Sequence, residues 1–323
     1  MFKKTTFAIS IFCLLIALYT NYFTDKNDSL PIVAIANYGP HASLDAAIAG
    51  FKKQMQEEGF TENHNIRYKI SDVGFDQSLI PQMLTNFKAQ HPKVMLVMTT
   101  PVGQAAKATI HDIPLIYTVI TDPVEAGLIK EKYKPDQNIT GSSEMQDLNA
   151  FLKFAKSILP TAHKVGLLYA TSEANDIALV RMMKASAAEL DMSVVAIPVE
   201  QARDVQLRMQ AFKNTVDFIY VGTSGPIQPT LPVISAEASK MHIPVFNVDA
   251  HAVQDGLALA SFGVDYKTVG RNAAKLTAGV LRGQKITDLK PLYPGPKDHH
   301  GLINKKLAAS LGIAIPSNIA TVA

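Results

Sequence analysis

The sequence holds a single cysteine, Cys13, in a chain of 323 residues. Because Cys13 lies in the first apolar run, the rest of the chain has no thiol that could form a disulfide, bind a metal ion or act as a nucleophile. The net charge is also small, since 31 Lys and Arg stand against 28 Asp and Glu, a formal charge of +3. So small an excess argues against a general attraction to nucleic acid. The length is ample for a buried core and predicts two domains or one large one.

Motifs that mark several common ligand and enzyme sites are absent as well. The sequence contains no G-x-G-x-x-G, G-x-x-x-x-G-K-[ST], G-x-S-x-G or H-E-x-x-H. These absences disfavour binding of dinucleotides or nucleoside triphosphates and disfavour zinc-peptidase chemistry. No helix-turn-helix pattern precedes the first predicted strand, which disfavours a transcription factor. We therefore expect no cofactor and no nucleic-acid partner.

One cluster of metal-ligating residue types stands out near the C-terminus, namely Asp298, His299 and His300. Adjacent histidines in a strand point to opposite faces, so they could not share one metal ion in that conformation. Residues 294–296 before them read Pro-Gly-Pro, which favours a solvent-exposed loop. We therefore expect no metal site.

Residues 1–30 have the features of an export segment. Lys3 and Lys4 precede an apolar stretch at residues 7–19, the pattern of a secretory signal peptide. No clear small-x-small cleavage site follows, and residues 5–23 carry no charge, close to the roughly 20 residues that a membrane-spanning helix needs. Residues 1–30 are therefore a signal peptide or a membrane anchor, followed by a linker. Lys3 and Lys4 on the cytoplasmic side would leave the main domain outside the inner membrane, in the periplasm.

From residue 31 onward, short apolar runs alternate with amphipathic stretches, the pattern of βαβ units and a parallel sheet. Strands are predicted first at residues 32–36, 65–70, 94–98 and 115–120, with helices at 43–58, 77–88 and 102–109. Ser43 is a good N-cap for the first of these helices and Gly59 a good residue to end it. The same order recurs about 125 to 132 positions later, with strands at 164–169, 194–198, 218–221 and 244–248 and helices at 174–190, 205–212 and 231–241.

This internal similarity predicts two doubly wound α/β lobes with parallel sheets that face one another. A single large α/β sheet is the alternative. In doubly wound sheets a ligand binds beyond the carboxyl ends of the strands, where free N–H groups at helix starts suit an anion. This rule selects residues 37–43, 99–103, 121–124, 170–175, 222–226 and 249–252. Aromatic residues that could add an apolar wall, although each alone is more typical of core packing, are Tyr38, Tyr117, Tyr169, Phe246 and Phe262.

Two aspartates occupy corresponding positions in the two halves. Asp122 and Asp249 each follow a predicted strand, so they could form a carboxylate pair for acid-base chemistry. An aspartate in that position often caps the next helix or orders its loop instead. A ligand amine would use the same geometry without any reaction.

The chain resembles the substrate-binding proteins of ABC importers, and among them the tryptophan or aromatic amino acid type with a type I periplasmic-binding-protein fold. The resemblance covers residues 31–316. The segments that carry it are Thr-Pro-Val-Gly-Gln-Ala-Ala at 100–106, Thr-Asp-Pro-Val-Glu-Ala-Gly-Leu at 121–128, Asn-Ile-Thr-Gly at 138–141, Leu-Tyr-Ala-Thr-Ser-Glu-Ala-Asn at 168–175, Gly-Val-Asp-Tyr at 263–266, Gly-Arg at 270–271 and residues 307–316.

The resemblance implies two Rossmann-like lobes joined by a hinge, with residues 31–142 and 251–285 in lobe 1 and residues 143–250 and 286–323 in lobe 2. It also implies a small-molecule ligand between the lobes. By position, the implied contacts are Thr100, Thr121, Asp122, Ser172, Glu173, Asn175, Thr223 and Asp249. Helix starts after Thr100 and Ser172 would receive a carboxylate, and Asp249 or Glu173 would receive an amine. Glu173 and Asn175 could equally be capping residues of a helix.

Two positions depart from the family pattern. After Thr223 the family usually carries Asp-Asn-Thr, where this chain has Ser224, Gly225 and Pro226. His251 stands where a further Asp is usual. Both changes remove acids from the second lobe, so a ligand without an α-ammonium group stays open beside an aromatic amino acid.

The function implied is that of a solute-binding component, not an enzyme, which closes on its ligand and delivers it to an ABC permease in the inner membrane. It would act as a monomer, with membrane anchoring through residues 5–23 as an option. Two alternatives remain. An uncleaved anchor would favour a membrane-tethered ligand sensor of a signalling system, and a two-lobed hydrolase would turn its ligand over.

Overall fold

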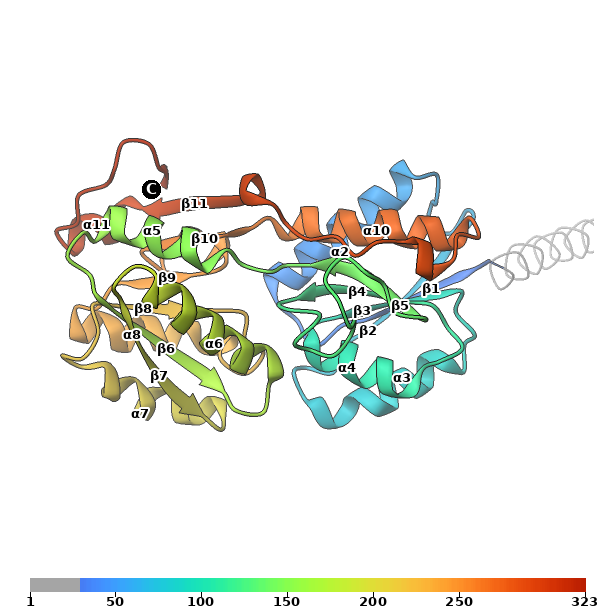
Figure 1. Ribbon diagram of the computed structural model, residues 1–323, viewed down its shortest axis with the longest axis horizontal. Coiled ribbons are helices and arrows are strands. Elements are labelled where there is room, and N and C mark those ends of the chain that lie inside the picture. The colour runs from blue at the N-terminus through green and yellow to red at the C-terminus, as the bar shows by residue number, and fades with distance from the viewer. Residues whose placement is uncertain (1–29) are drawn as a thin grey trace, which may run out of the picture.

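The computed structural model describes residues 30–323, so the expected export segment and Cys13 lie outside the described residues. Within that range, no helix is long and apolar enough to cross a membrane. The chain forms two α/β lobes that lie end to end (Figure 1). The prediction of two lobes is confirmed, and the single large sheet is excluded because the strands divide into two separate sheets.

The first lobe is built on a five-stranded parallel sheet in the order β2-β1-β3-β4-β5. Its strands are β1 (Ile32–Ala36), β2 (Arg67–Ser71), β3 (Val94–Met98), β4 (Leu115–Ile120) and β5 (Ile139–Ser143). All residues of β3, β4 and β5 are buried, as expected for strands covered by helices on both faces. The helices are α2 (Ala42–Glu57), α3 (Ile80–Lys88), α4 (Thr100–Thr109) and α10 (Tyr266–Leu281).

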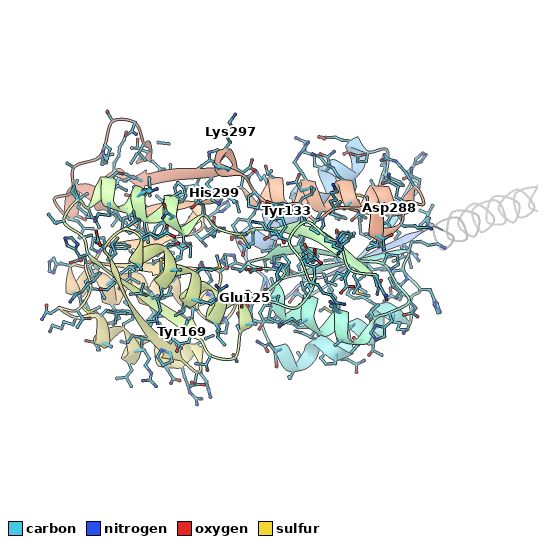
Figure 2. All side chains as sticks on the ribbon, in the orientation of Figure 1. Glu125, Tyr133, Tyr169, Asp288, Lys297 and His299 are labelled. Atoms are coloured by element: carbon cyan, nitrogen blue, oxygen red, sulfur yellow. The ribbon has the colours of Figure 1, made fainter. Side chains whose placement is uncertain are left out.

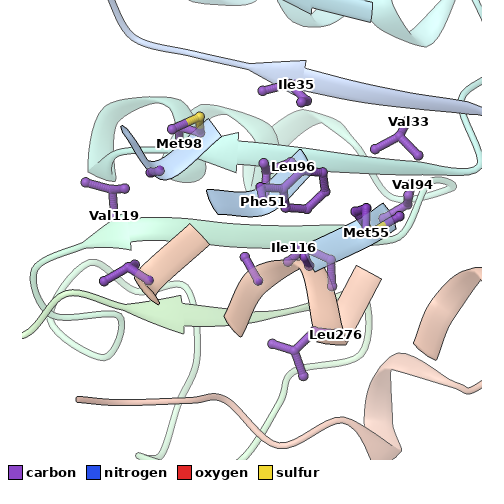
Figure 3. Close-up of a cluster of buried hydrophobic side chains, with 14 of the residues drawn as sticks. Val33, Ile35, Phe51, Met55, Val94, Leu96, Met98, Ile116, Val119 and Leu276 are labelled. Atoms are coloured by element: carbon purple, nitrogen blue, oxygen red, sulfur yellow. The ribbon is translucent and has the colours of Figure 1, made fainter. Parts of the chain in front are cut away.

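Two apolar layers hold this lobe together. On one face of the sheet, Val33, Leu96 and Ile116 pack with Phe51 of α2 and with Leu276 of α10 (Figure 3). On the other face, side chains of α3 and α4 pack against the alternate residues of the same strands. The period of two along each strand thus supplies both layers from one sheet.

The second lobe has a seven-stranded sheet in the order β12-β11-β10-β9-β8-β6-β7. Its strands are β6 (Lys164–Ala170), β7 (Ser193–Val199), β8 (Phe218–Val221), β9 (Val245–Asn247), β10 (Ala260–Val264), β11 (His299–Asn304) and β12 (Ala320–Val322). The order β7-β6-β8-β9-β10 repeats that of the first lobe, and only the β10–β11 pair is antiparallel among the described strands.

The helices of the second lobe cover both faces of its sheet. One layer contains α5 (Leu148–Ile158), α6 (Ala174–Ala188) and α11 (Lys305–Ser310), and the other contains α7 (Val205–Met209), α8 (Leu231–Met241) and α9 (Ala250–Gln254). Short 3₁₀ helices occur at η1 (Gln77–Leu79), η2 (Ala202–Asp204), η3 (Gln210–Phe212), η4 (Gln228–Thr230), η5 (Ile286–Asp288) and η6 (Pro296–Asp298).

Three segments cross between the lobes, and two of them lie elsewhere than predicted. The first crossing follows β5, which ends at Ser143 and belongs to the first sheet. Residues 251–264 were assigned to the first lobe, but β10 pairs with β9 in the second sheet, and the chain returns to the first lobe only at α10. Residues 286–292 were assigned to the second lobe, but Leu292 exchanges backbone hydrogen bonds with Gly141 and Ser143 of β5. In both cases, backbone pairing between strands determines which lobe a segment belongs to. This pairing cannot be recognised from the sequence alone.

The expected loop at residues 298–300 is also corrected. Asp298 ends a 3₁₀ turn, while His299 and His300 begin β11 and pair with Val264 and Gly263 of β10. The His299 ring stacks on Phe262, and its Nε2 accepts the N–H of Asp147. The histidine pair is therefore part of the sheet next to a crossing segment.

Candidate functional site

A cavity of about 60 Å³ lies between the lobes. A single water molecule needs about 10–15 Å³ measured in this way, so the space can hold a small organic molecule. The first lobe contributes Tyr38, His41, Ser43, Leu44, Phe75, Thr99, Thr100, Pro101, Val119 and Thr121 to its wall. The second lobe contributes Glu173, Asn175, Thr223, Ser224, Gly225, Gln228 and Val248, and the crossing segments contribute Glu144 and Tyr266.

The topology explains this location. Most of the lining residues follow the carboxyl ends of β1, β3 and β4 in one lobe and of β6, β8 and β9 in the other. These are the edges at which doubly wound sheets bind ligands. Two helices also begin beside the cavity, α2 behind His41 and α4 behind Thr99.

Four side-chain hydrogen bonds join the lobes across the cavity, and the longest, at 3.5 Å, runs from Gln77 Nε2 to Glu173 Oε1. The hydroxyl of Tyr38 donates to Glu173 Oε1 over 3.0 Å. The hydroxyls of Thr121 and Thr223 lie 3.0 Å apart. Another bond runs from the Ser43 hydroxyl to the Asp249 carboxylate. An exposed ion pair between Arg181 of α6 and Glu125 adds a further polar contact between the lobes. Glu125 is labelled where the lobes meet in Figure 2.

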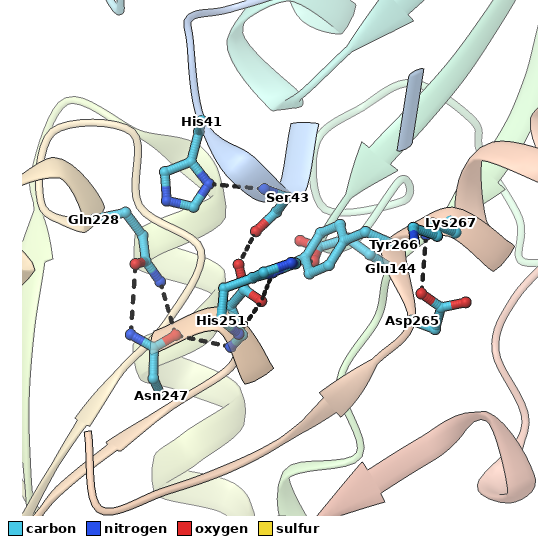
Figure 4. Close-up of polar contacts among 10 residues, drawn as sticks. His41, Ser43, Glu144, Gln228, Asn247, His251, Asp265, Tyr266 and Lys267 are labelled. Carbon is cyan, nitrogen blue, oxygen red and sulfur yellow. Dashed lines mark hydrogen bonds and ion pairs between the residues drawn. The ribbon is translucent and has the colours of Figure 1, made fainter. Parts of the chain in front are cut away.

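Ser43 was predicted to cap α2, and the structure corrects this. The helix begins one residue earlier, and His41 is the N-cap, because its Nδ1 accepts the N–H of Ser43 over 3.3 Å (Figure 4). The Ser43 hydroxyl is thereby free to bond Asp249 in the other lobe. Burial lowers the pKa of His41, so this ring is neutral at pH 7 and suited to accept the bond. The prediction that Gly59 ends the helix is confirmed, since Gly59 follows the C-cap Glu58 with a φ of 85°.

Glu173 is the acid of the second lobe's wall and is 1% exposed. Its Oε1 accepts from Tyr38 and, at 3.5 Å, from Gln77 Nε2. Its Oε2 accepts from Asn175 Nδ2 at 3.2 Å and from the N–H of Gly225 at 3.1 Å. Four donors of the protein therefore surround this one carboxylate.

Glu144 is the acid of the first crossing segment and is also 1% exposed. Its Oε1 accepts from Thr121 at 3.0 Å and its Oε2 from the Tyr266 hydroxyl at 2.7 Å (Figure 4). Burial raises the pKa of Glu144 to about 7, and the hydrogen bonds lower it by less. Burial, helped by the charge of Glu173, likewise raises the pKa of Asp176, just behind the wall, to about 8.

The start of α4 is a further polar feature of the wall. The first N–H groups of a helix have no partner inside it, and they form its positive end. Thr99 precedes the helix with a φ of 73°, which is strained for a threonine. Its buried hydroxyl has no hydrogen-bond partner within residues 30–323, and the same holds for Asn175 Oδ1. These groups can bond a ligand that enters the cavity.

Five of the eight residues proposed from the sequence line this cavity. They are Thr100, Thr121, Glu173, Asn175 and Thr223. Asp249 is buried and reaches the wall through its bond to Ser43.

The other two lie outside the cavity wall. Asp122 Oδ1 accepts the N–H groups of Val124 and Glu125, so it caps a turn. Ser172 is exposed ahead of α6. Asp122 and Asp249 are therefore no catalytic pair at the cavity.

Sequence reasoning missed Glu144 as a site residue and Tyr266 with it. Glu144 lies three residues after the Asn-Ile-Thr-Gly segment, and Tyr266 ends the Gly-Val-Asp-Tyr segment. Both segments were recognised as family motifs without a site role. Their position in the crossing segments is the signal that could have found them. Among residues 30–323, no group of three or more His, Cys, Asp or Glu could hold a metal ion.

This geometry, two similar lobes with a cavity between them that is lined by polar and apolar side chains, is that of a two-lobed small-molecule binding protein. Residues 32–323 match the family described as ABC transporter substrate binding protein, and the chain belongs to that family. A tyrosine-binding protein of Clostridioides difficile is 31% identical over 257 residues, covering 80% of this chain and 74% of that protein.

Solved structures agree with the family. A conserved domain protein of Vibrio cholerae superposes with a TM-score of 0.86 at 28% identity, over 91% of this chain and all of the other. A Streptococcus ABC domain in complex with L-Trp gives 0.86 at 26% identity, with the same coverage. A ligand-free, open substrate-binding protein from Clostridium difficile gives only 0.71 at 27% identity, over 91% and 99% of the two chains. At nearly the same identity, this chain therefore superposes better on the L-Trp complex than on the ligand-free, open protein.

The chain is therefore an extracytoplasmic solute-binding component of an ABC importer. Family membership implies a small-molecule ligand between the lobes and an ABC permease as partner.

Proposed function

We propose that the ligand is an α-amino acid with an aromatic side chain. The observation that carries this proposal is the composition of the closed cavity. Tyr38, Phe75 and Val119 offer apolar surface for a ring, and the Tyr38 and Phe75 rings already meet edge to face at 5.4 Å. Two buried acids can attract an ammonium group, and the start of α4 can receive a carboxylate.

The relatives support the same ligand class. One similar protein is named for tyrosine binding, and another was solved with L-Trp. Both ligands share the amino acid group and differ in the ring. The departures at Gly225 and His251 do not remove every acid from the cleft, because Glu173 and Glu144 both line it.

Function follows from closure. A ligand that contacts both lobes stabilises the closed state over the open one, and the permease distinguishes the two states. We propose that the ligand is released unchanged, with no bond made or broken. The protein would act as a periplasmic monomer, with residues 5–23 either cleaved off or retained as an anchor in the inner membrane.

A thermal-shift screen of the purified full chain tests this proposal. Amino acids, nucleosides and small carboxylates are added one at a time. Binding to the native state alone stabilises it by about 2.7 kcal/mol at 100 times Kd, so Tyr, Phe or Trp should raise the melting temperature clearly. An Arg203→Ala variant, altered at an exposed position of η2, is the control and should respond like the wild type. A shift with another class alone, or recovery of the ligand as a product, would contradict the proposal.

A further inference from the structure

The cavity wall is acidic and has no fixed cation. Among the described residues that line it, two are Glu and none is Lys or Arg. An amino acid ligand would therefore bring the only full positive charge into a space bounded by two buried carboxyl groups. Which carboxyl group takes that charge depends on how many hydrogen bonds each already accepts.

Glu173 has no acceptor capacity left in the closed arrangement. A carboxylate offers about four lone-pair sites, and Glu173 accepts from Tyr38, Gln77, Asn175 and Gly225. The Tyr38 and Gln77 bonds come from the opposite lobe, so closure itself fills two of these sites. A ligand ammonium group at Glu173 would have to displace a protein donor.

Glu144 differs in this respect. The two hydrogen bonds of good geometry that it accepts come from the hydroxyl groups of Thr121 and Tyr266, while the side chains of Thr223 and Gln146 act on it more weakly. Its acceptor sites are therefore less fully used than those of Glu173. Asp249 is not a candidate for binding the ammonium group. Its oxygens accept hydrogen bonds from Ser43 and His251, and it does not line the cavity.

We propose that Glu144, and not Glu173, receives the ammonium group of the bound amino acid. This inference rests on the proposed function, since it assumes an amino acid ligand. Glu173 then serves as a positioning residue, whose role is to join the lobes through Tyr38. Glu144 lies between β5 and α5, in a crossing segment, so the ligand's charge acts directly at the hinge.

The proposal predicts a pH dependence of binding. The titratable groups that face Glu144 are Tyr266 of α10 and Tyr220 of β8, and burial keeps both phenols neutral by raising their pKa. The charge of Asp249, the N-cap of α9, raises the pKa of Tyr266 further. Burial raises the pKa of Glu144 to about 7, and a ligand cation beside it lowers that pKa again. Binding therefore releases a proton near pH 6.5, and the affinity falls as the pH drops below 7.

The test compares each amino acid with its deaminated analogue by titration calorimetry on the full chain. The probes are L-tyrosine, L-tryptophan and L-phenylalanine against 3-(4-hydroxyphenyl)propionate, indole-3-propionate and 3-phenylpropionate. Hydrogen bonds to charged groups contribute about 1.5–3 kcal/mol, which corresponds to about 10- to 150-fold in affinity. Glu144→Gln should lose about that factor for the amino acid and little for the analogue. Glu173→Gln should weaken both by a similar factor, because it disturbs closure.

The outcomes separate this inference from the proposed function. If the wild type binds no amino acid, both fail. If it binds one, but Glu144→Gln keeps the preference over the analogue or Glu173→Gln alone loses it, only the inference fails. If Glu144→Gln does not fold, the inference is tested on the wild type instead. The number of protons released on ligand binding is measured at pH 6.5 and at pH 8, each in two buffers of different ionisation enthalpy. Release at pH 6.5 that vanishes at pH 8 supports the inference, and no release at either pH overturns it.

Discussion

At the scale of single residues, the contact between Tyr38 and Glu173 across the cleft requires a glycine at position 225. A Cβ atom on Gly225 would overlap the Tyr38 ring and come within 2.7 Å of Glu173 Oε1. The Gly225 N–H also donates to Glu173. The Ser-Gly-Pro sequence at 224–226 therefore makes room for a tyrosine that reaches across from the other lobe.

Gly225→Ala should accordingly weaken ligand binding. The added methyl group pushes Tyr38 away from Glu173 in the closed state but leaves the open state unhindered. Because the acceptor is a carboxylate, loss of that hydrogen bond alone costs about 1.5–3 kcal/mol, roughly 10- to 150-fold in Kd, and the overlap adds to it. Tyr38→Phe, which deletes only the hydroxyl, should give the smaller effect. Calorimetry with the tightest-binding amino acid measures both, and an unchanged Kd in Gly225→Ala would contradict this account of closure.

Residues at strand ends show how far the sequence could predict the site. Thr100 and Thr223 line the cavity because they follow the carboxyl ends of parallel strands, the edge at which doubly wound sheets bind ligands. The same rule selected Asp122 and Ser172, which turn away, since position at a strand end does not say whether a side chain faces the cavity or caps a turn. Glu144 was missed because its place depends on how the chain crosses between the lobes.

At the scale of elements, the close contact of α2 and α10 is the main feature. A Cβ atom on Gly50 would overlap the backbone of Lys267, and one on Gly270 would overlap that of Ala47. The two helices thus meet backbone to backbone over one face of the first sheet (Figure 1). Tyr266, the first residue of α10, donates to Glu144, so this packing also positions the hinge.

Gly270→Ala should therefore destabilise the protein. The two helices would have to separate, and overpacking of this kind costs about 1–3 kcal/mol of the free energy of unfolding. Urea denaturation measures the loss. Gln56→Ala, at an exposed position of the same helix pair, is the control and should change stability by no more than about 0.5 kcal/mol. Equal stability of both variants would show that the helices are less closely packed than described.

Strands could be predicted from the sequence where their residues are mostly apolar. The run at β3 is entirely apolar, that at β4 is apolar except for Thr118, and both coincide with predicted strands. The strand β5 reads Ile-Thr-Gly-Ser-Ser and was not predicted as a strand, although all of it is buried. Its hydroxyl groups make this possible, because Thr140 donates to the Leu289 carbonyl and Ser143 to that of Ile120. Such bonds satisfy polar groups in the interior, and they form only with partners distant in sequence.

At the scale of the whole molecule, the fold converts a ligand contact into a change of shape. Three crossing segments connect the lobes, and Glu144 and Tyr266 of two of these segments line the cavity. The bonds Tyr38–Glu173, Gln77–Glu173, Thr121–Thr223 and Ser43–Asp249 join the two lobes, so separation of the lobes would have to break them. The better match to the L-Trp complex than to the ligand-free, open protein fits this arrangement. The repeat along the sequence predicted the two lobes, whereas the crossings at 265 and 293–298 depended on long-range strand pairing.

Small-angle X-ray scattering of the purified full chain, with and without L-tyrosine, L-tryptophan or L-phenylalanine, tests the central claim most directly. If the protein closes on an aromatic amino acid, at least one of them should reduce the radius of gyration in a saturable way, with one ligand bound per chain and recovered unchanged. A radius of gyration that stays constant with all three, while another class of molecule reduces it, would contradict the account.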